Sequence, residues 1–199
     1  MSEWNTRHTL LKRARNNQDT RAWEEFVYYY RPYLYQVSRR MQLNHHDAEE
    51  VTQLSLVKLW KALPDFEYNE KKGRFRGWLC TITGNTAKTF MRSEASRNKR
   101  HDRMKNGEIE GYLDEINEPE INEIAESEWR IYVANLAWEN IKGDLHNNAR
   151  DAFLMFSEGV KVPEIAKRLG LAEESIYVYK KRVEWRLFKE IKSLEEDLG

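Results

Sequence analysis

Two stretches of the sequence combine cationic side chains at helical spacing, and cations in that arrangement can hold phosphates. Near the C-terminus, Lys181, Arg182 and Arg186 lie within two turns of an expected helix. Residues 73–85, GRFRGWLCTITGN, set arginines beside aromatic rings. Rings stack on unpaired bases while Lys and Arg follow the phosphates, as single-stranded nucleic acid requires. Both stretches therefore predict nucleic-acid binding.

The charges are strongly segregated, although 33 basic residues balance 33 acidic ones. Residues 1–100 contain 19 Lys and Arg against 11 Asp and Glu, whereas residues 101–142 contain 4 against 11. Residues 176–192 are basic again, with 6 against 2. This asymmetry predicts two surfaces that face nucleic acid, separated by an acidic stretch with a different role.

The composition favours a helical protein. Nine Gly and four Pro in 199 residues are few for a sheet protein, because sheets need many turns. One Cys excludes a disulfide framework and points to the reducing cytoplasm. No apolar run approaches the length of a membrane span, so we expect no membrane insertion. The sequence predicts an all-α fold of two helical domains joined by a flexible acidic linker.

The helical segments follow from apolar spacing and from capping residues. Asp19 is expected to cap the helix at 20–31, and Pro32 to interrupt it before helix resumes at 33–41. Asp47 is expected to open another helix through a capping box. The acidic stretch 104–127 lacks a sustained apolar face, which is typical of a linker. The expected helices cover residues 6–16, 20–31, 33–41, 47–63, 75–100, 129–141, 148–158, 162–169 and 173–194. The expected domains are 1–102 and 129–199, with the linker at 103–128.

The C-terminal domain has the pattern of a helix-turn-helix. Residues 162–169 and the helix after Gly170 each carry one apolar stripe, and Gly170 suits the left-handed residue that ends a helix. These short helices must pack on one another and on Phe153, Leu154 and Phe156. With Ile176, Val183 and Leu187 inward, the outward residues are Glu174, Tyr177, Val178, Lys181, Arg182 and Trp185. The alternative is a helical hairpin with a solvated basic face.

The helix from Asp47 to Leu63 is apolar on nearly every side. Either it is the central helix of its bundle, which we favour, or another protein covers one side. In the next helix Trp78 is assigned to the core. For Phe75, Arg76, Asn85, Lys88 and Arg92 two readings stay open: contact with nucleic acid, or core anchoring by the ring and solvation of the polar groups.

These segments resemble a known family. Residues 47–66, DAEEVTQLSLVKLWKALPDF, followed by GRFRGWLCTITGN, resemble region 2 of bacterial RNA polymerase sigma factors of the extracytoplasmic-function group. Residues 162–183, VPEIAKRLGLAEESIYVYKKRV, resemble region 4, in the family's order. The resemblance implies a sigma factor that binds core polymerase, directs it to promoters through their −10 and −35 elements, and assists melting.

The resemblance also implies roles for individual residues. The β′ subunit of core polymerase would bind Asp47, Glu50, Gln53, Leu56 and Trp60. The −10 element and its melted non-template strand would bind Arg74, Phe75, Arg76, Asn85, Lys88 and Arg92. The −35 duplex would bind Glu174, Ser175, Tyr177, Val178, Lys181, Arg182 and Arg186. The acidic linker would pass through the polymerase near its active-site and RNA-exit channels, and an anti-sigma factor is a further possible partner.

Two other functions are weighed against this one. A stand-alone helix-turn-helix regulator would bind duplex DNA tightly and symmetrically without polymerase. An enzyme acting on nucleic acid would need clustered carboxylates or a nucleophile in the basic domains, and the sequence offers neither, nor a Gly-rich phosphate loop. We therefore expect no enzymatic activity and no cofactor. His45, His46 and Asp47 are read as an exposed helix start rather than a metal site, and Cys80 as a packing residue.

Overall fold

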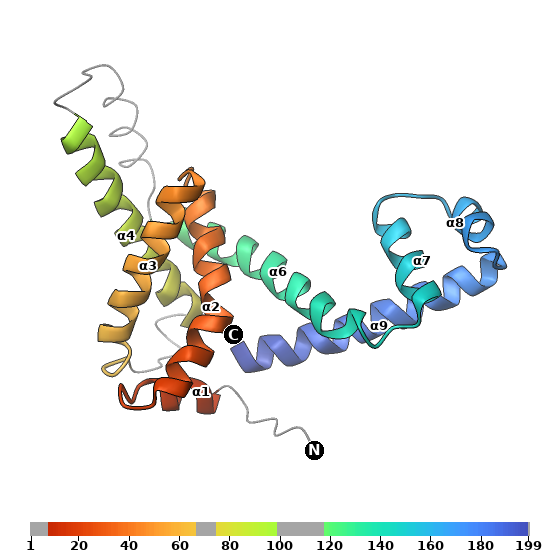
Figure 1. The fold of residues 1–199 in the computed structure, drawn as a ribbon, viewed down its shortest axis with the longest axis horizontal. Coiled ribbons are helices and arrows are strands. Elements are labelled where there is room, and N and C mark those ends of the chain that lie inside the picture. The colour runs from red at the N-terminus through yellow and green to blue at the C-terminus, as the bar shows by residue number, and fades with distance from the viewer. Residues whose placement is uncertain (1–7, 67–74, 99–117, 199) are drawn as a thin grey trace. The chain divides into compact units, whose positions relative to one another are not determined.

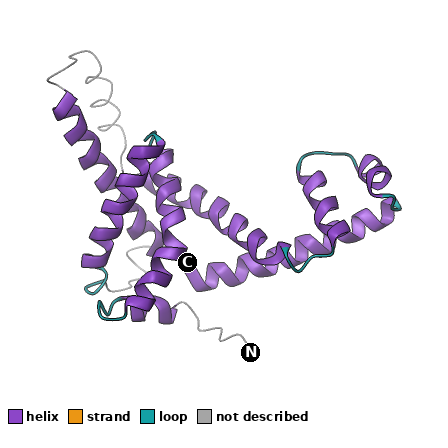
Figure 2. Cartoon of the chain, viewed as in Figure 1, coloured by secondary structure: helices purple, strands orange, loops and turns teal. Residues whose placement is uncertain are grey.

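A computed structural model describes residues 8–66, 75–98 and 118–198, and no strand occurs in these ranges (Figure 2). The helices are α1 (His8–Ala14), α2 (Thr20–Arg40), α3 (His45–Ala62), α4 (Phe75–Asn98), α6 (Glu118–Lys142), α7 (Asn147–Ser157), α8 (Val162–Leu169) and α9 (Glu173–Leu198). The chain divides into two compact units, Met1–Tyr132 and Val133–Leu198, and α6 contributes to both. The all-α, two-domain fold class is confirmed.

The first unit is built on α2, α3 and α4, which pack together (Figure 1). The expected break at Pro32 is wrong, since α2 runs through it without interruption. A proline inside a helix removes one backbone hydrogen bond and crowds the preceding turn, at a cost of about 3 kcal/mol. Here Phe26 and Tyr30 before the proline and Leu34 after it are all buried in one core, so both halves are held.

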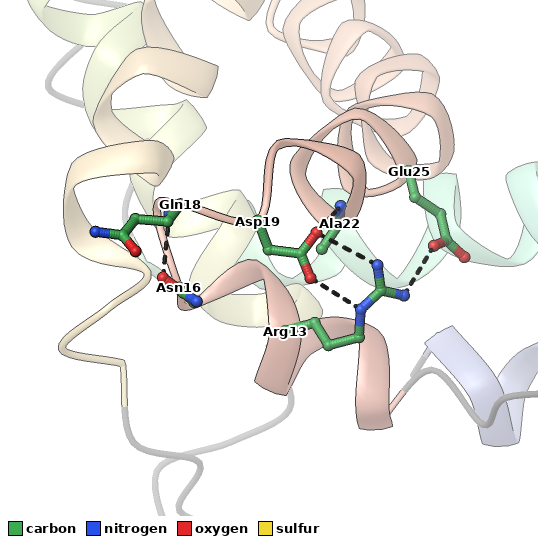
Figure 3. A network of polar contacts seen from close by, with 6 residues as sticks. All are labelled: Arg13, Asn16, Gln18, Asp19, Ala22 and Glu25. Carbon is green, nitrogen blue, oxygen red and sulfur yellow. Dashed lines mark hydrogen bonds and ion pairs between the residues drawn. The ribbon is translucent and has the colours of Figure 1, made fainter.

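A polar network fixes the corner between α1 and α2 (Figure 3). Asp19 caps α2 as expected, because its Oδ1 accepts a hydrogen bond from the Ala22 backbone at 2.9 Å. The same carboxylate accepts from Arg13 Nε at 3.0 Å, and Arg13 also reaches Glu25 at 3.6 Å. The Arg13 hydrogen bond, followed by the one from Ala22, lowers the pKa of Asp19.

The start of α3 lies earlier than the sequence indicated. Asn44 is the N-cap, with its Oδ1 accepting from the Asp47 backbone at 2.9 Å and its Nδ2 donating to the Asp47 carboxylate at 2.7 Å. Asp47 therefore lies in the first helical turn, at His45–Asp47, instead of preceding it. Asn and Asp are about equally good caps, so the N-cap could lie three residues upstream of Asp47.

Part of the expected linker is helical. Residues 118–128 form the first part of α6 and belong to the first unit. Ile121, Ala125 and Trp129 are buried at four-residue spacing, which gives this acidic segment a narrow apolar stripe. Only three apolar positions define the stripe, so the surrounding glutamates obscured it. Residues 103–117 of the expected linker lie outside the described residues.

The second unit contains the helix-turn-helix. Its core consists of Ala152, Val162, Ile165, Ala166 and Ile176. Gly170 ends α8 with φ +65° and ψ +36°, the left-handed conformation expected for it. From α7, Phe156 packs on this core as expected, whereas Leu154 is exposed and Phe153 stacks on Trp138. The expectation for Leu154 is wrong because the small Ala152 occupies the inward position.

Candidate functional site

The outer face of α9 is the most exposed of the predicted surfaces. Ile176 and Val183 are buried, which turns the opposite side of the helix to solvent. All six residues expected there are exposed: Glu174, Tyr177, Val178, Lys181, Arg182 and Trp185. A shallow hollow on this face is lined by Lys181, Arg182, Trp185 and Arg186. We call Glu174, Tyr177, Val178, Lys181, Arg182, Trp185 and Arg186 the α9 face.

Three further side chains show how the α9 face is bounded. Ser175 is half-buried, so it lies at the edge. Arg186 is exposed and donates from Nη1 to the Asp144 backbone carbonyl at 3.1 Å. Lys180 turns inward, with Nζ 3.8 Å from the centre of the Phe156 ring. A lysine on this ring stabilises the packing of α9 on α7, so it does not add to the outward charge.

One exposed ring, that of Phe188, extends the α9 face beyond the predicted residues. Trp185 is 59% exposed and Phe188 66% exposed. Lys189 Nζ lies 3.9 Å from the centre of the Trp185 ring. Phe188 was not among the predicted residues, although it lies three positions beyond Trp185 and therefore on the same side of the helix.

The beginning of α4 differs from the expectation. Phe75 is 1% exposed and packs edge-on against Phe26 and Tyr30, with centroids 6.2 and 5.5 Å away. Arg76 is 4% exposed, and its Nε and Nη2 donate to the two Glu126 carboxylate oxygens at 2.8 and 2.7 Å. Of the two readings for Phe75, core anchoring holds in this conformation. Neither side chain is accessible to nucleic acid there, and Arg74 lies outside the described residues.

The middle of α4 keeps three of the predicted residues at or near the surface. Asn85 and Arg92 are exposed and Lys88 is half-buried. Their spacing of three and four residues places them on one side of the helix. Trp78 is half-buried against Phe66, with ring centroids 4.4 Å apart, in line with its assignment to the core. We call Asn85, Lys88 and Arg92 the α4 face.

The exposed side of α3 is shifted from the one predicted. Glu50 and Gln53 are exposed, but Leu56 is half-buried and Trp60 packs edge-on against Trp23 at 4.8 Å. Asp47, half-buried, takes part in the cap. The apolar residues that are exposed are Leu54, at 42%, and Val57, at 53%. They were missed although Glu50, Gln53, Leu54 and Val57 follow the 3- and 4-residue steps of one helix side. We call these four the α3 face.

The Cys80 thiol is buried and stays protonated. Cys80 Sγ is 3.2 Å from Tyr33 Oη, and that hydroxyl donates to the Ala125 carbonyl at 3.1 Å. Burial raises the pKa of the Cys80 thiol to about 12. The thiolate is the nucleophile, so Cys80 serves packing.

The described residues contain neither a cluster of metal ligands nor a helix that could span a membrane. In residues 8–66, 75–98 and 118–198, no three His, Cys, Asp or Glu side chains gather in a group that could hold a metal ion. None of the helices described there has both the length and the apolarity to cross a membrane.

Two family models match the chain. Residues 26–97, from within α2 nearly to the end of α4, match the family described as Sigma-70 region 2. Residues 148–198, covering α7 to α9, match the family described as a putative ATPase subunit of terminase (gpP-like). The first match contains the α3 and α4 faces, and the second contains the α9 face.

A curated relative and a solved structure are also similar. The ECF RNA polymerase sigma factor SigE of Mycolicibacterium smegmatis is 31% identical over 64 residues, which is 32% of this chain and 23% of that protein. The match thus spans less than a quarter of the relative's length. The structure of CnrH in complex with the cytosolic domain of CnrY is 22% identical, with a TM-score of 0.35 over 94% of this chain and 97% of that one. Residues 26–97 therefore form a segment similar to Sigma-70 region 2, and the similarity to SigE extends over 64 residues.

Proposed function

We propose that the protein is a sigma factor that binds core RNA polymerase, directs it to promoters and assists their melting. One observation carries the proposal: a single chain joins a region 2 unit to a helix-turn-helix whose second helix turns a basic face outward. Recognition of two promoter elements needs two such surfaces on one molecule. No catalytic chemistry is needed for this role, and the cytoplasm is the expected location.

The α9 face is proposed to read the −35 element in the major groove. Lys181 and Arg182 can donate to guanine edges or phosphates, and the Glu174 carboxylate can accept from a cytosine amino group. Arg186 lies further along the helix and is assigned to the phosphate backbone. The Arg186 contact with the Asp144 carbonyl supports a fixed position for this cation.

The α3 face is proposed to bind the β′ subunit of core polymerase. Apolar residues that stay exposed on a folded unit are common at protein interfaces, where they form the dry centre. Leu54 and Val57 would form that centre, with Glu50 and Gln53 as its polar rim. Asp47, Leu56 and Trp60 would then support the interface from below. Contacts with the β subunit and with an anti-sigma factor remain proposals without assigned residues.

The α4 face is proposed to follow the non-template strand of the −10 element. Lys88 and Arg92 can hold phosphates, and the Asn85 amide can hydrogen-bond an unpaired base.

The net charge of zero is compatible with DNA binding by a protein that is mounted on polymerase. Polymerase supplies much of the affinity, while sequence-independent attraction to phosphates would only weaken specificity.

Co-purification with core polymerase and transcription from a promoter library test the proposal. The chain should bind core and start transcription at a subset of promoters. Leu54→Glu with Val57→Glu should weaken core binding by about tenfold or more, because two interface residues become charged. Ile131→Glu is the matched control, since Ile131 is also an exposed apolar residue of the first unit. Equal losses in both variants, or no binding of core by the natural chain, would refute the assignment.

The same preparation tests the stand-alone regulator. The match of residues 148–198 to a family other than sigma factors is the observation that favours this alternative. A stand-alone regulator would bind duplex DNA tightly without polymerase and at a two-fold symmetric site. The sigma-factor proposal expects weak, asymmetric duplex binding by the free chain.

A further inference from the structure

The first part of α6 covers α4 through a set of specific contacts. Ile121 lies against Gly84, where an added Cβ would come within 3.0 Å of the Ile121 Cδ1 atom. Five residues along α6, Glu126 binds the Arg76 guanidinium through both oxygens. These contacts lie wholly within the first unit. The acidic segment is therefore seated on the same helix that carries the α4 face.

Residues 125–129 of α6 also contact α2. The Tyr33 hydroxyl donates to the Ala125 carbonyl, and the Trp129 ring packs edge-on against Tyr33 at 5.1 Å. Glu128 pairs with Arg40 at 3.5 Å. Residues 118–132 thus make specific contacts with both α2 and α4.

The Arg76–Glu126 pair has the geometry of phosphate recognition. A guanidinium presents parallel N–H groups that fit a carboxylate or a phosphate equally well. Arg76 also lies over the Trp129 ring, 5.6 Å from its centroid. The Glu126 side chain is 41% exposed, so solvent and ligands reach the carboxylate while the guanidinium beneath it is buried. The pair resembles a site whose anion is supplied by the chain itself.

One feature opposes the docking of α6. The Trp129 ring is completely buried, yet its Nε1 finds no hydrogen-bond acceptor among the described residues. Burying an N–H without a partner costs the free energy of removing it from water, and undocking restores that water. The contacts of residues 118–132 are specific, but the unpaired Trp129 N–H group offsets part of the stabilisation that they provide.

We propose that residues 118–132 of α6 form an intramolecular cover over α4, in which the Glu126 carboxylate occupies Arg76 in place of a nucleic-acid phosphate. Contact of a melted strand with Arg76 then requires this segment to lift and release the guanidinium. The inference rests on the proposed function, because it assigns a control to Arg76, a further possible ligand of the −10 strand on the helix that carries the α4 face. A covered site binds with an affinity reduced by the fraction of molecules in which it is open.

The test measures binding of a labelled single-stranded DNA oligonucleotide of mixed sequence to the full chain by fluorescence anisotropy. Glu126→Gln keeps the shape of the side chain and removes its charge, so it should tighten binding by roughly tenfold. Glu123→Gln is the matched control, because Glu123 is exposed on the same helix and carries the same charge. It should change the affinity less than twofold. Equal gains in both variants would mean that general charge is responsible, and would overturn the cover.

Two further variants separate the guanidinium from the helix. Arg76→Gln together with Glu126→Gln should abolish the gain, because the released phosphate ligand is then missing. Ile121→Ala loosens α6 on Gly84 without changing any charge and should tighten binding several-fold. A gain that persists without Arg76, or no gain with Ile121→Ala, would contradict the proposal.

Hydrogen–deuterium exchange supplies a readout that needs neither DNA nor polymerase. Glu126→Gln should speed exchange in residues 118–132 and leave α3 unchanged. Unchanged exchange in α6 would overturn the cover even if transcription were normal. Failure of the natural chain to bind core polymerase would instead refute the sigma-factor assignment and leave these exchange results interpretable.

Discussion

The helices α4 and α9 were both expected to present cations to nucleic acid, yet only α9 presents its predicted residues as a group. α9 contacts α7 and α8 along its buried stripe, so the remaining sides face solvent. α4 contacts α2 and α3, and α6 covers it as well. A helix with one packed side can be oriented from its apolar spacing, whereas a helix covered from several directions cannot.

Buried polar residues add to the difficulty in α4. Thr83 and Thr86 are buried, and each hydroxyl donates to the carbonyl four residues earlier, at 2.9 and 2.7 Å. Threonine can satisfy its hydroxyl within the helix and so does not need solvent. Polar positions of α4 therefore do not mark its exposed side. In α9 the inward positions are apolar, and the two sides can be told apart.

The largest expected effect is that of Phe75→Ala. Phe75 lies among aromatic rings in the core, so its loss should lower the free energy of unfolding of the first unit by about 4 kcal/mol. Urea denaturation followed by circular dichroism measures the change. Asn85→Ala, on the exposed side of the same helix, should stay within about 0.5 kcal/mol. If Phe75→Ala left stability intact, Phe75 would not be a core residue and the contrast with α9 would fail.

The equivalent comparison on α9 uses Ile176 and Val178. Ile176→Ala removes a buried side chain from the core of the second unit and should cost about 3 kcal/mol. Val178→Ala, on the exposed side, should change stability by less than about 0.5 kcal/mol. Hydrogen exchange of α7 to α9 reports the stability of this unit separately. Similar losses for both variants would show that the α9 face is also packed.

Duplex binding distinguishes two neighbouring lysines. Lys181→Gln with Arg182→Gln should weaken binding to a −35 duplex and reduce the slope of log K against log salt by about 2, since two phosphate contacts are lost. Lys180→Gln should leave the slope unchanged, because its ammonium group lies on the Phe156 ring. Titrations at several salt concentrations measure the slopes. A slope change for Lys180→Gln would place its charge on the DNA side.

The smallest effect concerns the acid dependence of α6. The hydrogen bond from Arg76 lowers the pKa of Glu126 below its ordinary value of 4.5, while burial acts in the opposite direction. The stabilisation by this pair is therefore complete above pH 4.5 and is lost as the pH falls through the lowered pKa. The cationic neighbours of Glu126 are Arg76 and Arg130, and burial raises the pKa of the Tyr33 hydroxyl and of the Cys80 thiol, so neither ionises in this range. Exchange in residues 118–132, corrected for its intrinsic rate, should rise below pH 4.5.

Glu126→Gln is the control for this acid response, because the variant has no carboxyl at that position. Its α6 exchange should not change over the same range. Asp19 also has a lowered pKa and pairs with Arg13, so the α1–α2 corner loosens in acid as well. Exchange must therefore be read locally in α6. An equal acid response in the variant would assign the effect to another carboxyl.

The C-terminal helices could be predicted almost residue by residue. Expected helices at 148–158, 162–169 and 173–194 correspond to Asn147–Ser157, Val162–Leu169 and Glu173–Leu198. Short helices with one apolar stripe and a glycine turn carry their boundaries in local sequence. The assignment of roles to the α3, α4 and α9 faces stays a prediction. Of the residues predicted to bind, all except Ser175 are exposed in α9, whereas only some are exposed in α3 and α4.

Local chemistry in the sequence determined the all-α fold, the helix-turn-helix and the outward face of α9, because helical spacing and capping act between residues at most a few positions apart. Only the tertiary structure decided that Pro32 lies inside a helix, that Leu54 and Val57 are the exposed apolar residues of α3, and that Glu126 covers Arg76. Those outcomes depend on which elements share a core. Residues separated by 50 positions, such as Arg76 and Glu126, meet only when the helices between them have packed.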